Sequence, residues 1–394
     1  MRSILPAAVL LFAGLGSGCG PPYSPPCQSV SSTVLESADF SAVATAPGHA
    51  PSFTVDAGGN VEVSWVGGLA PPTGPGNPAG QARALLRRYT PTGERLQARD
   101  VPLAPAMFGA DPPASIAWVG DTVWQLSAPF TFVPGSPPRL DSSLHLDVLD
   151  SAGAVVRSSD LGVPPCQGCV IVAGLRRVGD RIAVVYRRNP LDVSLPPELR
   201  VLLFDAAGTL VSSQGLELPP EPQLTLAALQ ALPNQDALLL ASGDQVSVVG
   251  SDLAERARLG PIRASSAVAS WDDARGLRAA WIHANRDVLV RHVPPGDAPR
   301  DELRVSRGNT VTALAAGAES LGLVFGDRLT RAFAWLGPDG RKRGGDLVLS
   351  TFEQQEGAFA ATRGLLVPLG ENRFAFFGIR PSGLIREEVA CAAR

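Results

Sequence analysis

Short runs of apolar or alternating residues, separated by turn residues, recur along the chain from Pro51 onward. Runs of this length and period are typical of β-strands in antiparallel sheets. The pattern predicts six strand pairs: Ser52 to Ala57 with Val61 to Val66, Ser115 to Val119 with Thr122 to Ser127, Val170 to Leu175 with Arg181 to Tyr186, Thr225 to Ala231 with Ala237 to Ala241, Ala267 to Trp271 with Leu277 to His283, and Val311 to Ala316 with Leu321 to Phe325. No segment keeps a helical period over ten residues, so we expect little helix.

A second type of hairpin also repeats. The clearest copy is Val201 to Ser212, in which Gly208 supplies the left-handed backbone residue that follows a type I turn. Similar turns end at Gly93, Gly153, Gly296, Gly340 and Gly383, and Gly250 to Leu253 is a degenerate copy. Successive turns lie 60, 55, 45, 43, 44 and 43 residues apart, which is typical of four-stranded propeller blades. The sequence therefore predicts an all-β fold, a β-propeller of seven four-stranded blades, with six blades as the alternative.

The last repeat allows two assignments. Gly364 to Gly370 is either its second strand, which keeps the turn spacing in step, or its first strand. In the second case the N-terminal segment Ser29 to Ala46, which has weak strand character, supplies the outermost strand. Both assignments close a ring.

The first residues have the features of a signal peptide. Arg2 is followed by the apolar run Ile4 to Leu15 and by the small residues Gly16 to Gly18, directly before Cys19. This arrangement is similar to a bacterial lipoprotein signal, which implies acylation of Cys19, although Leu15 lies one position further from the cysteine than that signal prefers. Secretion without a lipid is the alternative.

These features divide the chain into three parts. Residues 1–18 are the predicted signal peptide, residues 19–50 hold the lipidated cysteine, a proline-rich tether and an N-terminal strand, and residues 51–394 form the propeller domain. The tether, Gly20 to Gln28, is too rich in proline to join a sheet and is expected to act as a semi-rigid spacer.

Without Cys19, an even set of four cysteines remains, as expected for an exported protein. We favour a disulfide between Cys27 and Cys391, because a propeller brings its two chain ends to one blade, and a second between the near neighbours Cys166 and Cys169. A redox-active pair or half of a metal site is the alternative for Cys166 and Cys169.

The charge balance argues against nucleic acid as a partner. The chain has 34 basic and 37 acidic residues, for a net charge of −3, and the basic residues are scattered rather than clustered. Phosphate binding requires clustered Lys and Arg.

Unequal loops are the strongest functional signal. The first three repeats carry long Gly/Pro-rich insertions between their second and third strands, at Gly67 to Gln81, Pro129 to Ser142 and Arg188 to Glu198. In a propeller these connections share one face with the links between blades, such as Gly162 to Cys169. Because loops on a rigid scaffold often carry binding residues, we expect a protein or glycan ligand at loops 67–81, 129–142 and 188–198.

Catalytic and cofactor motifs are sparse. The four histidines, His49, His145, His283 and His292, have no metal-ligand spacing, and no nucleophile elbow, phosphate-binding loop or calcium loop is present. We therefore predict no cofactor, no metal site and no catalytic residue. The adjacent carboxylates Glu387 and Glu388 are expected to be solvated, and Trp65, Trp118, Trp124 and Trp281 to pack between blades.

In overall pattern, the signal and the repeated hairpins resemble propeller lipoproteins of Gram-negative bacteria, including those of the myxobacterial type. The resemblance implies an outer-membrane location, on the periplasmic or cell-surface side, because Gly20 rather than Asp follows the cysteine. It assigns no active-site residue. Our first hypothesis is a lipid-anchored, non-enzymatic binding or scaffold module; the alternative is a glycan-active hydrolase or lyase with its site in the central depression of the propeller.

Overall fold

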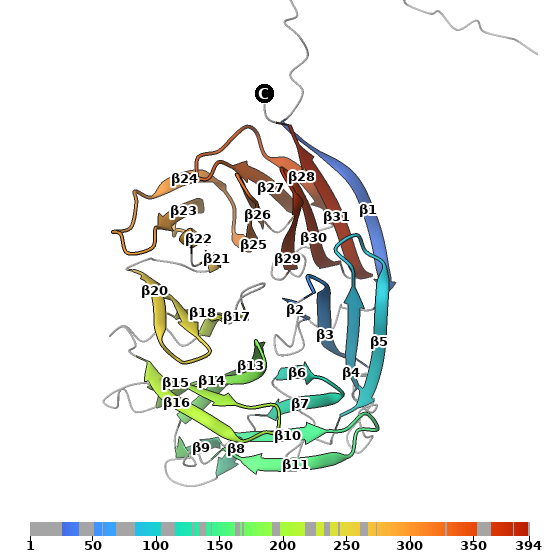
Figure 1. Cartoon of the computed structure of the whole chain (residues 1–394). Helices are drawn as coiled ribbons and strands as arrows, with labels where there is room; N and C mark the ends of the chain where they lie inside the picture. Colours follow the sequence, from blue (N-terminus) through green and yellow to red (C-terminus); the bar gives the residue numbers. More distant parts are fainter. Residues whose placement is uncertain are drawn as a thin grey trace, which may run out of the picture.

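The computed structural model describes residues 26–38, 51–56, 58–67, 83–103, 115–127, 130–133, 139–142, 144–161, 166–167, 169–190, 198–216, 226–231, 237–242, 245–260, 267–272, 274–327, 329–352, 364–380 and 382–392. These residues form a ring of seven four-stranded antiparallel sheets around a central axis (Figure 1). The seven-bladed prediction is thereby confirmed, and the described residues contain no helix. No helix within these ranges is thus long and apolar enough to cross a membrane.

Each blade runs from an inner strand A to an outer strand D. The blades are β2 (Ser52–Val55), β3 (Val61–Gly67), β4 (Arg83–Tyr89) and β5 (Arg95–Pro102); β6 (Ser115–Val119), β7 (Thr122–Ser127), β10 (His145–Leu149) and β11 (Val155–Asp160); β13 (Cys169–Val178), β14 (Arg181–Pro190), β15 (Glu198–Phe204) and β16 (Leu210–Leu216); β17 (Leu226–Ala231), β18 (Ala237–Ser242), β19 (Gln245–Gly250) and β20 (Glu255–Leu259); β21 (Ala267–Asp272), β22 (Gly276–Ile282), β23 (Asp287–Val293) and β24 (Leu303–Arg307); β25 (Thr310–Ala316), β26 (Leu321–Gly326), β27 (Thr330–Leu336) and β28 (Leu347–Thr351); and β29 (Gly364–Gly370), β30 (Arg373–Arg380), β31 (Gly383–Cys391) and β1 (Cys27–Ser37).

The predicted glycine turns join strands C and D. In blade 3 the Gly208 amide donates to the Asp205 carbonyl at 2.9 Å, the Asp205 amide donates to the Thr209 carbonyl at 3.0 Å, and Gly208 has φ +81°. The same pair of hydrogen bonds closes the turns at Gly93, Gly153, Leu253 and Gly340. Leu253 takes the glycine position with φ +64°, so the degenerate copy keeps the turn at some cost in backbone strain.

The last blade follows the second of the two assignments. Gly364–Gly370 is its inner strand β29, and β1 pairs with β31 to supply the outermost strand. The Gly383 turn therefore joins strands B and C, not C and D as its spacing suggested. The step from Gly340 to Gly383 is still 43 residues because the 12 residues between β28 and β29 make up for a step of three strands rather than four.

Covalent and ionic contacts close the ring at β1. Cys27 and Cys391 form the predicted disulfide across the β1–β31 pair. At the other end of β1, the Glu36 carboxylate accepts a hydrogen bond of 2.6 Å from Arg87 Nε in blade 1. Arg87 also pairs with Asp100 at 2.6 Å, and its guanidinium stacks over the Trp65 ring. The disulfide thus holds β1 within blade 7, and the Glu36–Arg87 ion pair links blade 7 to blade 1.

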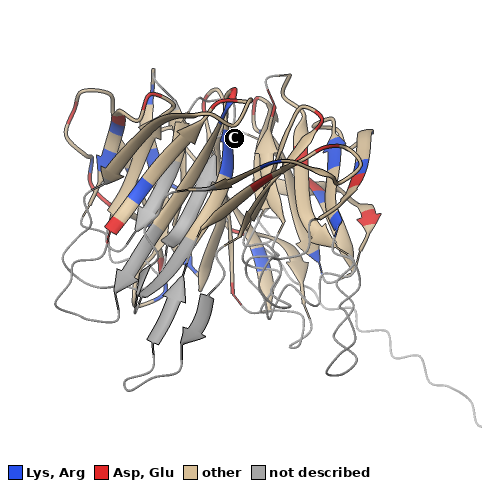
Figure 2. Cartoon of the chain, turned by 90° about the horizontal axis from the view of Figure 1, so that it is seen from below, with Lys and Arg blue, Asp and Glu red and all other residues tan. Residues whose placement is uncertain are grey.

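Apolar side chains fill the spaces between neighbouring blades. Trp124 of blade 2 and Phe204 of blade 3, for example, meet edge to face with ring centroids 6.2 Å apart. The four tryptophans predicted to pack between blades, Trp65, Trp118, Trp124 and Trp281, are all buried. Acidic and basic residues are spread around the ring (Figure 2).

The two faces of the ring differ in their connections. We call the face with the A–B and C–D turns the turn face, and the face with the B–C and D–A connections the loop face. Cys27 pairs with Cys391 at the turn face, whereas Ser37 pairs with Gly383 at the loop face. The two ends of the described chain, Pro26 and Ala392, therefore lie together at the turn face. Figure 1 shows the start of β1 beside the end of β31 at the periphery of the ring.

Candidate functional site

A small additional sheet lies on the loop face at blades 2 and 3. The insertion predicted as the loop Pro129 to Ser142 contains strands β8 (Phe130–Val133) and β9 (Arg139–Ser142), which form a hairpin. A two-residue strand, β12 (Cys166–Gln167), pairs with β9. Strand β12 belongs to the connection from blade 2 to blade 3. The structure therefore pairs this connection with the insertion of blade 2, and both were predicted to lie on the same face.

The other two predicted insertions extend blade strands. In blade 3, β14 continues to Pro190 and β15 begins at Glu198, so most of the segment Arg188 to Glu198 outside these strands lies beyond the described residues. In blade 1, β3 ends at Gly67 and β4 begins at Arg83. The remainder of the Gly67 to Gln81 segment lies outside the described residues.

A cavity of about 20 Å³ with a mixed polar and apolar lining lies at the inner edges of blades 1, 2 and 3. Its polar lining comes from Ser52, Thr54, Glu62 and Ser64 of blade 1 and from Arg176 and Arg177 of blade 3. Trp118 of blade 2 also lines it, and its indole Nε1 is buried with no hydrogen-bond partner among the described residues. A cavity of this volume has room for about one water molecule, which could bond to the polar groups of the lining.

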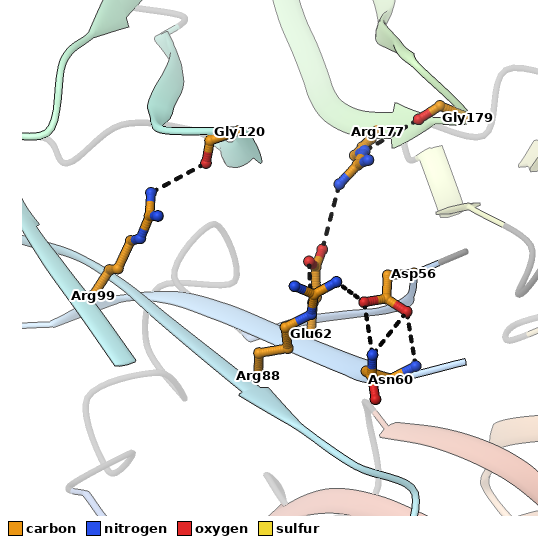
Figure 3. A network of polar contacts seen from close by, with 8 residues as sticks. All are labelled: Asp56, Asn60, Glu62, Arg88, Arg99, Gly120, Arg177 and Gly179. Atoms are coloured by element: carbon orange, nitrogen blue, oxygen red, sulfur yellow. Dashed lines mark hydrogen bonds and ion pairs between the residues drawn. The ribbon is translucent and has the colours of Figure 1, made fainter. Parts of the chain in front are cut away.

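Glu62 connects blade 1 to blade 3 across this cavity (Figure 3). Its carboxylate lies 3.7 Å from Arg88 Nε of the same blade and 3.7 Å from Arg177 Nη1. Burial raises the pKa of Glu62, and the positive charge of Arg177 opposes that rise. Arg88 also pairs with the buried Asp56, which accepts hydrogen bonds from Asn60.

The contact between Glu62 and Arg177 links blade 1 to blade 3 beside this cavity. Glu62 and Arg177 are far apart in sequence and carry no motif, so no sequence signal pairs them. Among the described residues, Glu62 is the one carboxylate in the lining. Glycoside hydrolysis generally uses two carboxylates flanking the scissile bond. The described lining is therefore one carboxylate short of that arrangement.

None of the three described histidines lines this cavity. His283 lies in the β22–β23 turn, where its Nδ1 is 3.0 Å from Asn285 Oδ1. His292 lies near the other end of β23, and its Nε2 donates to the Arg275 carbonyl at 2.6 Å. Burial lowers the pKa of His292, and the hydrogen bond to the Arg275 carbonyl opposes that shift. His145 begins β10, and His49 lies outside the described residues.

The expectation that Glu387 and Glu388 are solvated is wrong. Both are buried on β31. Glu387 accepts from Arg380 Nη2 at 2.9 Å, and Glu388 accepts from Arg386 Nη2 at 2.8 Å and also pairs with Arg373. Their side chains lie on opposite faces of the strand, as expected. Both faces of β31 are covered, because blade 1 packs on one side and blade 6 on the other, while β1 pairs with its outer edge.

A buried arginine that the sequence did not indicate lies beside Glu387. Arg331 on β27 donates from Nη2 to the Ile379 carbonyl at 3.0 Å and stacks on Phe376, with 4.7 Å between guanidinium and ring centre. Burial lowers the pKa of Arg331 to about 10, and the charge of Glu387 opposes that shift. This cluster lies between blades 6 and 7, and it contributes to the packing of the two sheets.

The structure tests only one of the predictions made for the cysteines. The Cys27–Cys391 disulfide is present. Cys166 and Cys169 lie in strands β12 and β13, but their side chains are outside the described part of the structure, so their pairing remains a prediction. Cys19 lies outside the described residues. Within the described ranges, no three His, Cys, Asp or Glu side chains gather as a metal site.

The fold defines the chain as a seven-bladed β-propeller closed by its N-terminal strand, with one face enlarged by an additional sheet. No family model matches the sequence, and no curated protein matches it either.

Proposed function

We propose that this propeller is a non-enzymatic binding or scaffold module that is anchored to the bacterial outer membrane by a lipid on Cys19. Its ligand, a protein or a glycan on the periplasmic or cell-surface side, binds at the loop face. The observation that carries the proposal is the β8–β9–β12 sheet, which belongs to no blade and is not needed to close the ring. Structured additions on a rigid scaffold are common sites of binding.

The ring itself supports a scaffold role. All seven blades are complete among the described residues, and a disulfide joins the first strand to the last. Such a closed ring presents its loops with little backbone rearrangement, which reduces the entropy lost on binding.

A glycan-active hydrolase or lyase is the second candidate. One observation favours it: the Glu62 carboxyl lines a cavity near the axis, and burial raises its pKa, as a general acid requires. Glu62→Gln separates the two candidates. We expect no change in binding at the loop face, and any polysaccharide cleavage by the intact protein that this variant abolishes would favour the enzyme.

A deletion tests the binding surface directly. Residues 129–142 are replaced by a two-residue turn in the full chain, and partners are compared by photo-crosslinking in intact cells. The matched control shortens the exposed turn-face connection between β23 and β24, residues 294–302, in the same way. We expect crosslinked products to be lost in the first variant and kept in the second. Equal loss in both, or in neither, would contradict binding at the loop face.

A further inference from the structure

The point where the tether leaves the ring is fixed by three contacts on the turn face. The Ala392 amide donates to the Pro26 carbonyl at 2.7 Å, directly beside the Cys27–Cys391 disulfide. The Cys391 amide donates to the Asn372 carbonyl in the A–B turn of blade 7 at 2.8 Å. Gly344 in blade 6 packs so closely on Pro26 that an added Cβ would lie 2.0 Å from the proline ring.

The tether keeps Cys19 close to this exit point. Seven residue steps separate Cys19 from Pro26, and a fully extended chain covers at most about 25 Å in that distance. Pro26 directly precedes Cys27, which lies at the turn-face end of the β1–β31 pair. A lipid on Cys19 therefore starts from the turn-face side of blade 7 and can reach a bilayer that lies against this face.

Basic residues lie next to this exit point. Arg341, Lys342 and Arg343 directly precede Gly344 in the C–D connection of blade 6. The Arg341 side chain is 79% exposed and lies 3.6 Å from the Asp339 carboxylate. Arg343 stacks over Trp335, and Lys342, which is the sole lysine in the sequence, pairs with Asp346 at 2.7 Å. The segment thus carries three cations against two carboxylates. Exposed cations beside a lipid anchor are attracted to acidic phospholipid headgroups.

We propose that the propeller rests with its turn face toward the bilayer, with residues 341–343 near acidic headgroups, and presents its loop face away from the membrane. This orientation rests on the lipidation of Cys19 within the proposed function. It places the β8–β9–β12 sheet where a partner from the aqueous phase can reach it.

Two positions at opposite ends of β27 test the orientation. Pro338 is exposed in the turn after β27 on the turn face, and Leu329 is exposed just before β27 on the loop face. A fluorescent amino acid is introduced at one position or the other in the full-length lipidated protein. The protein is then bound to vesicles that contain phosphatidylglycerol and a headgroup-labelled quenching lipid.

We expect at least twofold stronger quenching at position 338 than at 329. Arg341→Glu with Lys342→Glu should reduce this ratio. Equal quenching, or stronger quenching at 329, overturns the orientation but leaves the anchor intact. A ratio that the charge variant does not change overturns the headgroup contact. If the unlabelled chain carries no lipid and does not float with vesicles, the anchor itself fails, and the orientation fails with it.

Discussion

Replacing Cys27 and Cys391 together with alanine removes the covalent link that closes the ring. The two cysteines are separated by 364 residues, so the disulfide closes almost the whole folded chain into one loop. In the chain-entropy model, a loop of that length stabilises the folded state by about 6 kcal/mol relative to the open chain. By the same relation, a bond between Cys166 and Cys169 would contribute only about 2 kcal/mol, because its loop is so short.

Equilibrium unfolding in guanidinium chloride measures both effects. We expect the free energy of unfolding of the Cys27→Ala, Cys391→Ala variant to fall by several kcal/mol, with the largest increase in amide exchange along β1. The matched control, Cys166→Ala with Cys169→Ala, should lose about a third as much. A loss below about 1 kcal/mol in the first variant, or a larger loss in the control, would refute the view that the N-terminal strand is the closure of the ring.

Three further predictions concern the stability of the ring. Arg87→Met removes the ion-pair partner of Glu36 at the seam between blades 7 and 1 and should cost roughly 3 kcal/mol in thermal or denaturant unfolding. Arg256→Met, which removes the exposed pair with Asp252, should cost less than about 1 kcal/mol. Equal costs in the two variants would contradict the role of the seam. Hydrogen bonds from Arg386 and Arg373 lower the pKa of Glu388, so the stability that Glu388 contributes is present above the carboxyl pKa of the unfolded chain and is lost as pH falls through the lowered value. Burial raises the pKa of Glu62, so the folded state becomes more stable relative to the unfolded chain as Glu62 is protonated at lower pH. Glu388→Gln should therefore flatten the loss of stability from pH 6 to pH 3 and Glu62→Gln should steepen it, and changes of the same sign in the two variants would contradict these assignments. Gly59→Ala should cost about 1 to 2 kcal/mol in chemical unfolding, since the site is open but φ is +80°, and a neutral result would show that this turn relaxes.

The blade repeat could be predicted from sequence because its signals are local. A type I turn followed by a left-handed residue depends on a few adjacent residues, so Gly208 and its copies mark the C–D hairpins directly. The strands predicted at Ser115 to Val119 and Thr122 to Ser127 match β6 and β7, because the turn between them is also marked by adjacent residues. Local signals do not decide between the two assignments of blade 7, because its closure depends on the pairing of β1 with β31 from opposite ends of the chain.

The sites were harder to predict because they depend on contacts between distant segments. Glu387 and Glu388 look like an exposed acidic pair in sequence, and only the covering of β31 on both faces shows why they are buried. Glu62 and Arg177 meet across blade 2, which no local pattern records. The β9–β12 pairing joins two segments whose composition indicates loops, since Pro and Gly dominate around them.

The most direct test of the account is the intact mass of the protein extracted from membranes of the cell that makes it, measured before and after reduction. We predict a chain that begins at Cys19, carries the added mass of acyl chains on that residue, and gains two hydrogens for the Cys27–Cys391 disulfide and two more for Cys166–Cys169. A chain that begins elsewhere without a lipid, or whose mass does not change on reduction, would contradict a lipid-held ring closed by its own termini.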